Sequence, residues 1–317
     1  MHHARTHTRK HTLAVTAILA AGALLLAGCS DPTTQKGGDS SSSSPDGKDP
    51  IIVSSANFTT SEIVANLYAE SLRDAGIPVE TKFNVGSREA YVPALKDGSI
   101  DLIPDFTGNL LLFLNKDADM SSREKIDTQL ATALQADGLE MLEPAPAEDK
   151  DALVVTEERA KQWKLQSIAD LKAHNDELKI AGAPEFKQRP VGLPGLEKNY
   201  GVVPKEFVSI SDGGGPATVK ALVNGDVQAA NIYTASSSIP ANKFVVLEDP
   251  KFNFPSQNTV PVISEKKVTD QVKKVLNGVS AKLTTEELVK LDEMVTGPQK
   301  LEPNAAAKQW LKEKGLI

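Results

Sequence analysis

Hydrophobic and polar residues alternate along most of this chain in a pattern that predicts strands followed by helices. The apolar run 51–53 predicts a strand, and Ile63, Leu67 and Leu72 have the spacing of the inward face of a helix over residues 61–74. The same order recurs further along the chain. Strands that alternate with helices are typical of an α/β fold, in which helices flank mixed, mostly parallel sheets.

Capping and turn residues set the expected ends of these elements. Thr60 or Ser61 can cap the first helix, Gly76 ends it, and residues 79–85 predict a second strand. Thr285 is a capping residue with an acidic first turn behind it. Apolar spacing near the C-terminus predicts helices at residues 264–283, 285–295 and 303–314.

An internal repeat indicates two similar half-units. Residues 86–107 align without a gap on residues 213–234, at a constant offset of 127. Average composition would give one or two identities by chance, whereas seven pairs are identical: Gly86/Gly213, Ala90/Ala217, Val92/Val219, Ala94/Ala221, Leu95/Leu222, Gly98/Gly225 and Thr107/Thr234. The alternative is that a common order of helix, turn and strand recurs without a shared origin.

Each copy of the repeat ends in an aromatic residue and a threonine, Phe106-Thr107 and Tyr233-Thr234. Ligands of open α/β sheets bind beyond the carboxyl ends of strands, so Phe106 and Tyr233 are expected to face each other across a cleft. The chain would then cross between two lobes near residues 149–156 and return through residues 245–262. The expected domains are lobe 1 over 51–153, lobe 2 over 154–247, and a return crossover that completes lobe 1 over 248–317.

The N-terminus is typical of a bacterial lipoprotein export signal, removed after residue 28. The apolar run 13–27 is shorter than the roughly 20 residues that span a bilayer. The sequence LAGC ends in Cys29, the only cysteine of the chain, which is expected to carry lipid, and residues 29–50 are too polar to fold and predict a disordered tether. The alternative is an ordinary cleaved signal. Its positive charges are Arg5, Arg9 and Lys10.

Charge and cysteine content narrow the function. Removal of the signal takes the formal net charge from −7 to about −10. An acidic chain without a run of lysine and arginine argues against a nucleic-acid partner. A single cysteine excludes a disulfide framework, so hydrophobic cores must hold the lobes together. The expected location is extracytoplasmic, lipid-anchored to the outer face of the cell membrane.

Five segments in order carry a family resemblance: NFT at 57–59, the run from GS to IDLIPDFTGN at 86–109, PEFKQRPVGLPGLEKNYGV at 184–202, VKALVNGDVQAANIYT at 219–234 and VVLEDPKFNFPSQNTVPV at 245–262. They resemble the substrate-binding lipoproteins of osmoprotectant ABC importers, most closely the actinobacterial ProX group. The resemblance implies a two-lobed, periplasmic-binding-protein-like fold of type II with a ligand cleft between the lobes. It also implies a monomer that binds a small-molecule osmolyte, an ABC permease with its ATPase, and the membrane through its lipid.

The ligand class implied by the family is a quaternary amine such as glycine betaine, choline, carnitine or proline betaine. A quaternary ammonium has no N–H to donate, so aromatic faces recognise it through cation–π attraction. The candidate rings are Tyr91, Phe106 and Tyr233, with Phe58 and Phe186 as weaker candidates that can instead fill their own lobes. Core packing is expected for Phe113, Phe207, Phe244 and both tryptophans.

Polar candidates complete the implied site. Arg189 can bind a carboxylate through paired N–H donors, or form an ion pair with Glu185 or Asp105. Asp105 itself can favour the cation or hold local structure, and backbone N–H groups near Ser87 or the 213–215 glycines can bind an anion or only permit a turn. The expected ligand-binding set is Asn57, Phe58, Ser87, Tyr91, Asp105, Phe106, Thr107, Arg189, Tyr233 and Thr234.

Two departures from the family pattern leave alternatives open. Many relatives have tyrosine at the positions of Phe106 and Leu193, so a less charged or aromatic solute, or a role as a tethered sensor or adhesin, remains an alternative. An enzyme is not expected, and neither a cofactor nor a metal. The one histidine of the mature body, His174, is expected at the surface, and GxSxG, HExxH and GxxxxGK motifs are absent from the sequence. Asp149 with Asp151 and Glu157 with Glu158 are expected to be solvated.

Overall fold

The computed structural model describes residues 49–317 of the chain. The expectations for the export signal, the lipid on Cys29 and most of the tether lie outside the described residues. Two five-stranded mixed sheets, each flanked by helices, make up the described part. This confirms the predicted α/β, two-lobed class of fold.

The first sheet has the strand order β2-β1-β3-β10-β4. β1 pairs in parallel with β2 and β3, while β10 lies between β3 and β4 and is antiparallel to both. The strand β10 comes from near the C-terminus, so this sheet is discontinuous in sequence. Its strands are β1 (Ile51–Ser54), β2 (Val79–Lys82), β3 (Leu102–Phe106), β4 (Leu139–Met141) and β10 (Thr259–Ser264).

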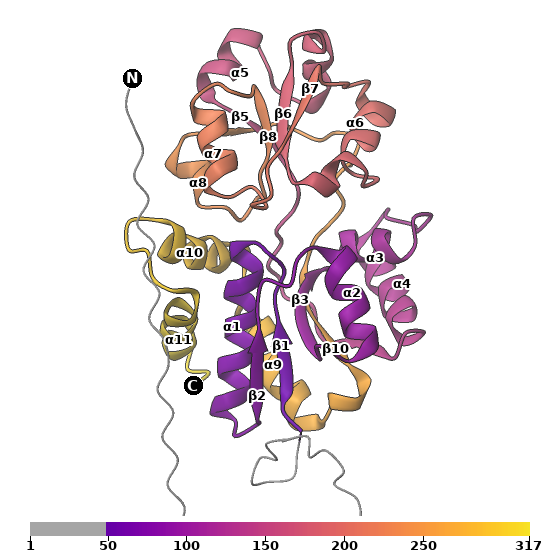
Figure 1. The fold of residues 1–317 in the computed structure, drawn as a ribbon, viewed down its shortest axis with the longest axis vertical. Coiled ribbons are helices and arrows are strands. Elements are labelled where there is room, and N and C mark those ends of the chain that lie inside the picture. Colours follow the sequence, from indigo (N-terminus) through magenta and orange to yellow (C-terminus); the bar gives the residue numbers. More distant parts are fainter. Residues whose placement is uncertain (1–48) are drawn as a thin grey trace, which may run out of the picture. The chain divides into compact units, whose positions relative to one another are not determined.

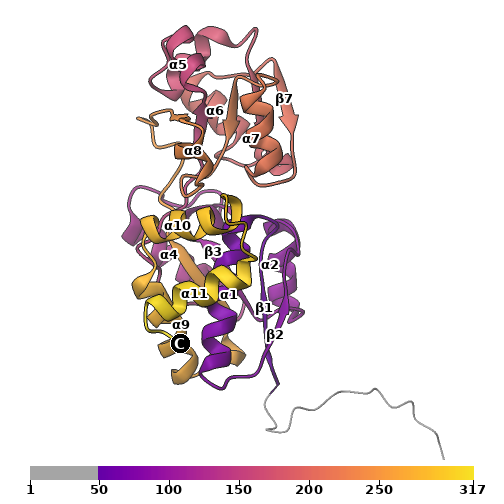
Figure 2. The same ribbon diagram turned by 90° about the vertical axis from the view of Figure 1, so that its left-hand side faces the viewer.

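Helices cover both faces of the first sheet, as Figure 1 shows. Successive strand residues point to opposite faces: Leu102 packs into a core with α1, α9, α10 and α11, and Ile103 into a core with α2, α3 and α4. Figure 2 shows α11 lying across α1, where Trp310 is buried. The helices are α1 (Thr59–Asp74), α2 (Arg88–Asp97), α3 (Thr107–Leu114), α4 (Arg123–Gln135), α9 (Asp270–Lys282), α10 (Thr285–Thr296) and α11 (Pro303–Glu313).

The second sheet repeats this plan in the order β7-β6-β8-β5-β9. β6 is parallel to β7 and β8, and β5 is antiparallel to β8 and β9. The strands are β5 (Leu153–Val155), β6 (Lys179–Gly182), β7 (Glu206–Ser209), β8 (Ala229–Asn231) and β9 (Val245–Val246). The helices are α5 (Glu157–Trp163), α6 (Leu193–Tyr200), α7 (Pro216–Val223) and α8 (Ser238–Ala241), with short 3-10 helices at Ile168–His174 and Pro184–Lys187 and, in the first lobe, at Glu265–Lys267.

We call residues 49–141 with 259–317 the first lobe and residues 153–246 the second lobe. Residues 142–152 form the outgoing crossover between the sheets, and residues 247–258 form the return crossover. The two crossovers are hydrogen-bonded side by side: the Asp149 N–H donates to the Gln257 carbonyl at 3.1 Å. The chain thus passes between the sheets at one paired site.

The predicted start of the first helix was wrong by one or two residues. The residue before α1 is Phe58, which provides no side-chain cap. The hydroxyl of Ser61 instead accepts the Ala56 N–H at 2.9 Å. Ser61 therefore holds the loop that leads from β1 into the helix, and this loop places Phe58 at the helix start.

Two other predicted element ends also differ from the structure. β2 ends at Lys82 and not at residue 85, and α9 starts at Asp270, capped by Thr269, and not at residue 264. Thr284 caps α10. Thr285 sits one residue inside that helix, and its hydroxyl accepts the Glu148 N–H of the outgoing crossover at 3.0 Å.

Candidate functional site

A small cavity lies where both lobes and the outgoing crossover meet. The first lobe lines it with Asn57, Phe58, Ser87, Arg88, Tyr91 and Phe106. The second lobe contributes residues that include Glu185, Arg189, Gly213 and Tyr233, and the crossover contributes Asp149. The space open to water-sized molecules has a volume of about 30 Å³, somewhat more than the roughly 10–15 Å³ that holds one water molecule. A ligand of several heavy atoms therefore enters only when side chains or lobes move.

Four aromatic residues line this cavity, Phe58, Tyr91, Phe106 and Tyr233, and the ring of Phe58 lies next to two of the others. Its ring centroid lies 6.0 Å from that of Phe106 and 5.4 Å from that of Tyr233. β3 ends at Phe106 and Tyr233 lies two residues beyond β8, so the strand-end placement of both rings is as the sequence indicated. The predicted pairing across the cleft runs through Phe58, which the sequence marked as a weaker candidate.

Gly213 permits the close approach of Phe58 to the second lobe. Its φ is +61°, in the left-handed region, and a Cβ atom at this position would lie 2.6 Å from the Phe58 Cβ. Real Cβ atoms do not come this close to a neighbour, so a side chain here would push Phe58 out of its place between the other rings. The glycine-rich loop thus makes room for an aromatic ring; in the structure it permits a turn and a contact.

A buried ion pair that the sequence reasoning missed forms one wall of the cavity. The Arg88 Nη2 lies 2.5 Å from Asp105 Oδ1, and the Tyr91 hydroxyl donates to Asp105 Oδ2 at 2.7 Å. Burial is the largest influence on Arg88 and acts to lower its pKa, but the charge and hydrogen bond of Asp105 together with Tyr91 and Tyr233 hold that pKa above its ordinary value. Burial also raises the pKa of Tyr91. Asp105 therefore positions Arg88 and Tyr91, and it pairs with Arg88 and not with Arg189.

The position of Arg88 in the sequence could have marked it as a site residue. Arg88 is the first residue of α2, where the positive end of the helix dipole disfavours a cation. A buried arginine at that point requires a carboxylate partner or a ligand. In the structure Arg88 is 7 % exposed, and its Nε has no hydrogen-bond partner among the described residues.

Arg189 links the two lobes at the cavity rim. Its Nη2 lies 3.2 Å from Glu89 Oε2 on α2 of the first lobe and 3.7 Å from Glu185 Oε1 in its own lobe. Of the predicted ion-pair partners, Glu185 is present and Asp105 is not. Ser87 also lines the cavity, and its hydroxyl donates to the Glu89 carboxylate. Asn57 lies exposed at the edge.

Thr107 and Thr234, which were predicted to contact the ligand, are not among the residues that line the cavity. The Thr107 hydroxyl accepts the Asn258 N–H of the return crossover at 3.2 Å, and the Thr234 hydroxyl accepts the Lys150 N–H of the outgoing crossover at 2.9 Å. In return, the Thr107 N–H donates to the Asn258 carbonyl and the Thr234 N–H donates to the Lys150 carbonyl. The identical threonines of the repeat therefore fasten the two crossovers.

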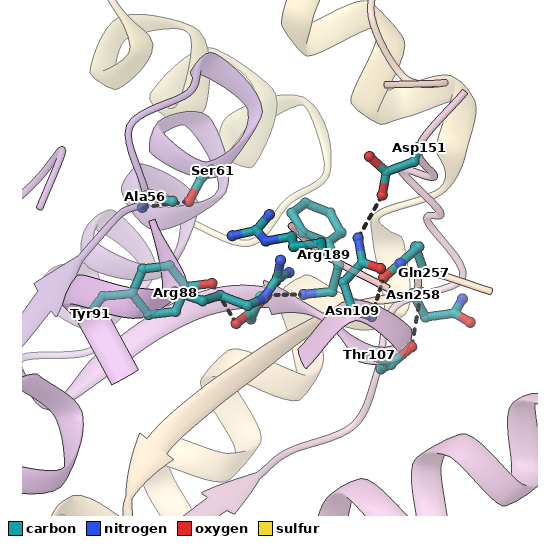
Figure 3. A network of polar contacts seen from close by, with 12 residues as sticks. Ala56, Ser61, Arg88, Tyr91, Thr107, Asn109, Asp151, Arg189, Gln257 and Asn258 are labelled. Atoms are coloured by element: carbon teal, nitrogen blue, oxygen red, sulfur yellow. Dashed lines mark hydrogen bonds and ion pairs between the residues drawn. The ribbon is translucent and has the colours of Figure 1, made fainter. Parts of the chain in front are cut away.

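The crossover acids are buried, so their prediction as solvated residues was wrong. Asp151 accepts the side-chain amides of Asn109 at 2.6 Å and Asn231 at 3.1 Å, one from each lobe. Figure 3 shows Asn109 between Asp151 and Gln257 of the return crossover. Asp149 is 3 % exposed, and its Oδ1 accepts the Ala235 N–H at 2.8 Å. The charged residues of the outgoing crossover therefore form buried hydrogen bonds next to the cavity, although the local sequence resembles an exposed segment.

Burial raises the pKa of Asp149 to about 7. The Ala235 N–H and the Thr60 hydroxyl favour the charged form, whereas the nearby carboxylates of Asp292 and Asp151 disfavour it. Burial likewise raises the pKa of Tyr233 above its ordinary value. The cavity thus combines aromatic faces with a carboxyl group that titrates near neutral pH.

A wider hollow of about 490 Å³ borders the cavity. Ser87, Asn109, Glu185 and Arg189 line both spaces. Phe113, predicted to be a core residue, is half-buried and lines the hollow. The hollow and the cavity therefore share a wall made of residues from both lobes.

Several other predicted residues lie away from the site. Leu193 packs at the edge of the second-lobe core, where Phe186 stacks 6.3 Å from Phe207. Leu193 is therefore not a cavity residue in this structure, and Phe186 fills its own lobe. His174 is half-buried and stacks at 3.9 Å on Trp163, so it is not a fully solvated histidine. Trp163 packs against the second-lobe core, as expected, although it is only partly buried.

Within residues 49–317, no cluster of histidine, cysteine, aspartate and glutamate has the arrangement of a metal site. No helix in the same range has both the length and the hydropathy to cross a bilayer.

The family model and the sequence relatives that match this chain all describe substrate-binding proteins of transport systems. The model of the substrate binding domain of the ABC-type glycine betaine transport system matches residues 49–313. The glycine betaine-binding protein YehZ of Escherichia coli K12 is 27% identical over 278 residues, which are 84% of this chain and 91% of that protein. The carnitine transport binding protein OpuCC of Listeria monocytogenes is 25% identical over 307 residues, or 93% and 94% of the two chains.

Solved structures share the fold. A glycine betaine/carnitine/choline ABC transporter structure superposes with a TM-score of 0.67 at 21% identity, over 84% of this chain and 99% of that one. Apo YehZ superposes with a TM-score of 0.61 at 26% identity, over 85% and 100% of the two chains.

Proposed function

Since the chain belongs to the family of substrate-binding domains of ABC-type glycine betaine transport systems, we propose that it captures a quaternary-amine osmoprotectant in the cavity between its lobes and delivers it to a permease. Glycine betaine, choline, carnitine and proline betaine are the candidate ligands. Capture requires binding and release but no covalent chemistry.

The meeting of Phe58, Phe106 and Tyr233 carries this proposal. Ring faces attract a cation that has no N–H, with about 0.5–2 kcal/mol per ring depending on desolvation. The rings lie 5.4 and 6.0 Å apart, so a small displacement of Phe58 exposes the faces of all three to one trimethylammonium group. Arg88 and Arg189 line the same cavity and supply N–H donors for the carboxylate of a betaine.

The crossovers supply the movement that the small free volume demands. Each lobe has its own sheet and its own core clusters, and hinges are typically a few residues at element ends. We expect the lobes to open about the paired crossovers, to admit the ligand through the wider hollow, and to close with Phe58 displaced. The Arg189–Glu89 ion pair joins the lobes at the rim in the closed form.

The proposal extends to location and partners. Export and lipidation of Cys29 would hold the protein at the outer face of the cell membrane, where a monomer meets the permease and its ATPase. Relatives described as transport binding proteins support this assignment. The anchor concentrates the protein near its partner without any contact between the lobes and the bilayer.

Calorimetric titration tests the proposal directly. The chain from residue 30 onward keeps every described residue and is titrated with the four amines and with a panel of uncharged aromatic solutes. We expect saturable binding of at least one amine, and a roughly 2- to 30-fold loss of affinity for Phe106→Leu and Tyr233→Leu, which corresponds to the free energy of one ring.

The matched control is Phe207→Leu, since Phe207 packs in the second-lobe core and not in the cavity. Unchanged affinity in both cavity variants would show that the ligand binds elsewhere. Binding of an uncharged solute and of no amine would assign a different cargo to this family member.

A further inference from the structure

Asp149 differs from every other buried acid around the cavity, because one of its oxygens has no hydrogen-bond partner. Its Oδ1 accepts the Ala235 N–H, but its Oδ2 accepts no well-formed hydrogen bond among the described residues; the Thr60 hydroxyl lies close enough to favour the charged form without hydrogen-bond geometry. By contrast, both oxygens of Asp105 and both oxygens of Asp151 accept hydrogen bonds. An unpaired buried carboxylate is costly unless a ligand completes it.

The neighbouring charges do not satisfy Asp149. Asp151, two residues along, and Asp292 on α10 are acids, and the latter accepts the Ser237 N–H at 2.8 Å. Across the cavity Arg88 is paired with Asp105, and Arg189 with Glu89 and Glu185. Tyr233 and Thr60 are neutral neighbours. Asp149 is therefore a site for negative charge that lacks a cation.

The same cavity also holds a donor that lacks an acceptor. The Arg88 Nε is buried without a partner, although the other end of its guanidinium binds Asp105. A carboxylate oxygen and a guanidinium N–H that are both unsatisfied, in one cavity with four aromatic rings, form a pattern complementary to a zwitterion. A small cation with an attached anionic or hydroxyl group can satisfy both.

We propose that Asp149 is the counter-charge for the cationic group of the ligand, and that Arg88 Nε–H receives its oxygen-bearing end. This assignment rests on the proposed function, and it deepens it by naming a charged partner in addition to the rings. The ligand class that follows is a compact organic cation, with or without a carboxylate, and neutral molecules of the same shape are disfavoured.

A pH dependence follows from this arrangement. The unliganded Asp149 carboxyl is largely protonated below about pH 7, with its titration shaped by burial and by the acids Asp292 and Asp151. The cation binds the ionised form, so binding below that pH releases a proton. The apparent affinity for a quaternary amine should fall by up to about tenfold per pH unit as the pH drops below 7.

The closing experiment compares ligands that carry the ammonium charge with isosteres that lack it. Choline and 3,3-dimethylbutan-1-ol, or glycine betaine and 3,3-dimethylbutanoate, differ only by carbon in place of the ammonium nitrogen. Both pairs are titrated at pH 6, 7 and 8 into the chain from residue 30 onward, as wild type, Asp149→Asn and Asp127→Asn. Asp127 on α4 is the matched control: its pKa is also raised by burial and its Oδ1 has no partner, but it does not line the cavity.

An opposite charge at 4–6 Å shifts a carboxyl pKa by about 1–3 units, and by linkage each unit corresponds to a tenfold change in ligand affinity. We therefore expect Asp149→Asn to weaken choline and glycine betaine roughly 10- to 1,000-fold at pH 8 and to remove the pH dependence. The variant should bind the neutral 3,3-dimethylbutan-1-ol as wild type does, and it should bind the anionic 3,3-dimethylbutanoate no more weakly, because a like charge has been removed. Asp127→Asn should bind all four ligands as wild type does.

Two results overturn the assignment and are distinguishable. If wild type binds choline or glycine betaine and Asp149→Asn binds it with the same affinity and pH profile, Asp149 is not the counter-charge, whereas the proposed function stands. If wild type binds no quaternary amine at any pH, the proposed function fails and this assignment fails with it.

Discussion

The unpaired carboxyl of Asp149 should make the unliganded protein less stable than an isosteric variant. Asp149→Asn keeps an oxygen that can accept the Ala235 N–H, but it removes a carboxyl group whose ionisation is unfavourable in its buried position. The asparagine amide can in addition donate into the cavity. We expect the free energy of unfolding of Asp149→Asn to exceed that of wild type at pH 8.

The magnitude follows from the pKa of Asp149, which is raised from 3.8 to about 7. One pKa unit corresponds to about 1.4 kcal/mol, so ionisation in the fold costs at most about 4 kcal/mol. The folded pKa is raised, so the stabilising contribution of the protonated form is complete below about pH 4 and is lost as the pH rises to about 7. The advantage of the variant should therefore be smallest at pH 4 and greatest above pH 7.

Urea denaturation of the unliganded proteins between pH 4 and 8, followed by circular dichroism, measures this difference. Asp151→Asn is the matched control, because Asp151 is equally buried and both of its oxygens accept amide hydrogens. Its loss should destabilise by about 1–3 kcal/mol at every pH. A difference between Asp149→Asn and wild type that does not change with pH would refute the reasoning.

Two further predictions concern the crossovers and the anchor. Thr107→Val and Thr234→Val each leave a crossover N–H without its side-chain acceptor. Each should lower the free energy of unfolding by about 1–3 kcal/mol in urea titrations, whereas Thr→Ser at either position should retain most of the wild-type stability. Equal loss in the serine variants would show that the methyl group and not the hydroxyl matters. Cys29→Ala should move the protein from the membrane fraction to the soluble fraction, and continued retention in membranes would show that the uncleaved signal anchors it.

Much of the fold was predictable from sequence, because hydrophobic spacing reflects which face of each element is buried. The alternation of strands and helices, the strand-end positions of Phe106 and Tyr233 and the helices that complete the first lobe all follow from such local patterns. The ends of elements were less predictable. Thr60, Ser61 and Thr285 all have capping side chains, and the structure uses Ser61 and Thr285 to bind backbone of other segments.

The site was harder to predict because its polar residues are defined by long-range contacts. Asp149 and Asp151 stand in a run of charged residues that any local pattern assigns to solvent. Distant segments enclose them: the return crossover and the loop at Ala235 beside Asp149, and Asn109 and Asn231 beside Asp151. Arg88 carried a local signal, a cation at the start of a helix. Phe58 was a candidate only through the family resemblance, because its place between two rings depends on Gly213 from the other lobe.

The attachment of both crossovers by equivalent threonines has a consequence for the ancestry of such proteins. Thr107 and Thr234 occupy the same point of two segments that are 127 residues apart, and each binds the crossover that leads into its own lobe. Duplication of a single ancestral segment would thus supply the threonine contacts of both crossovers at once. Later substitutions among the aromatic and acidic residues of the cavity can then change which ligand is bound, while the threonine–crossover contacts are retained.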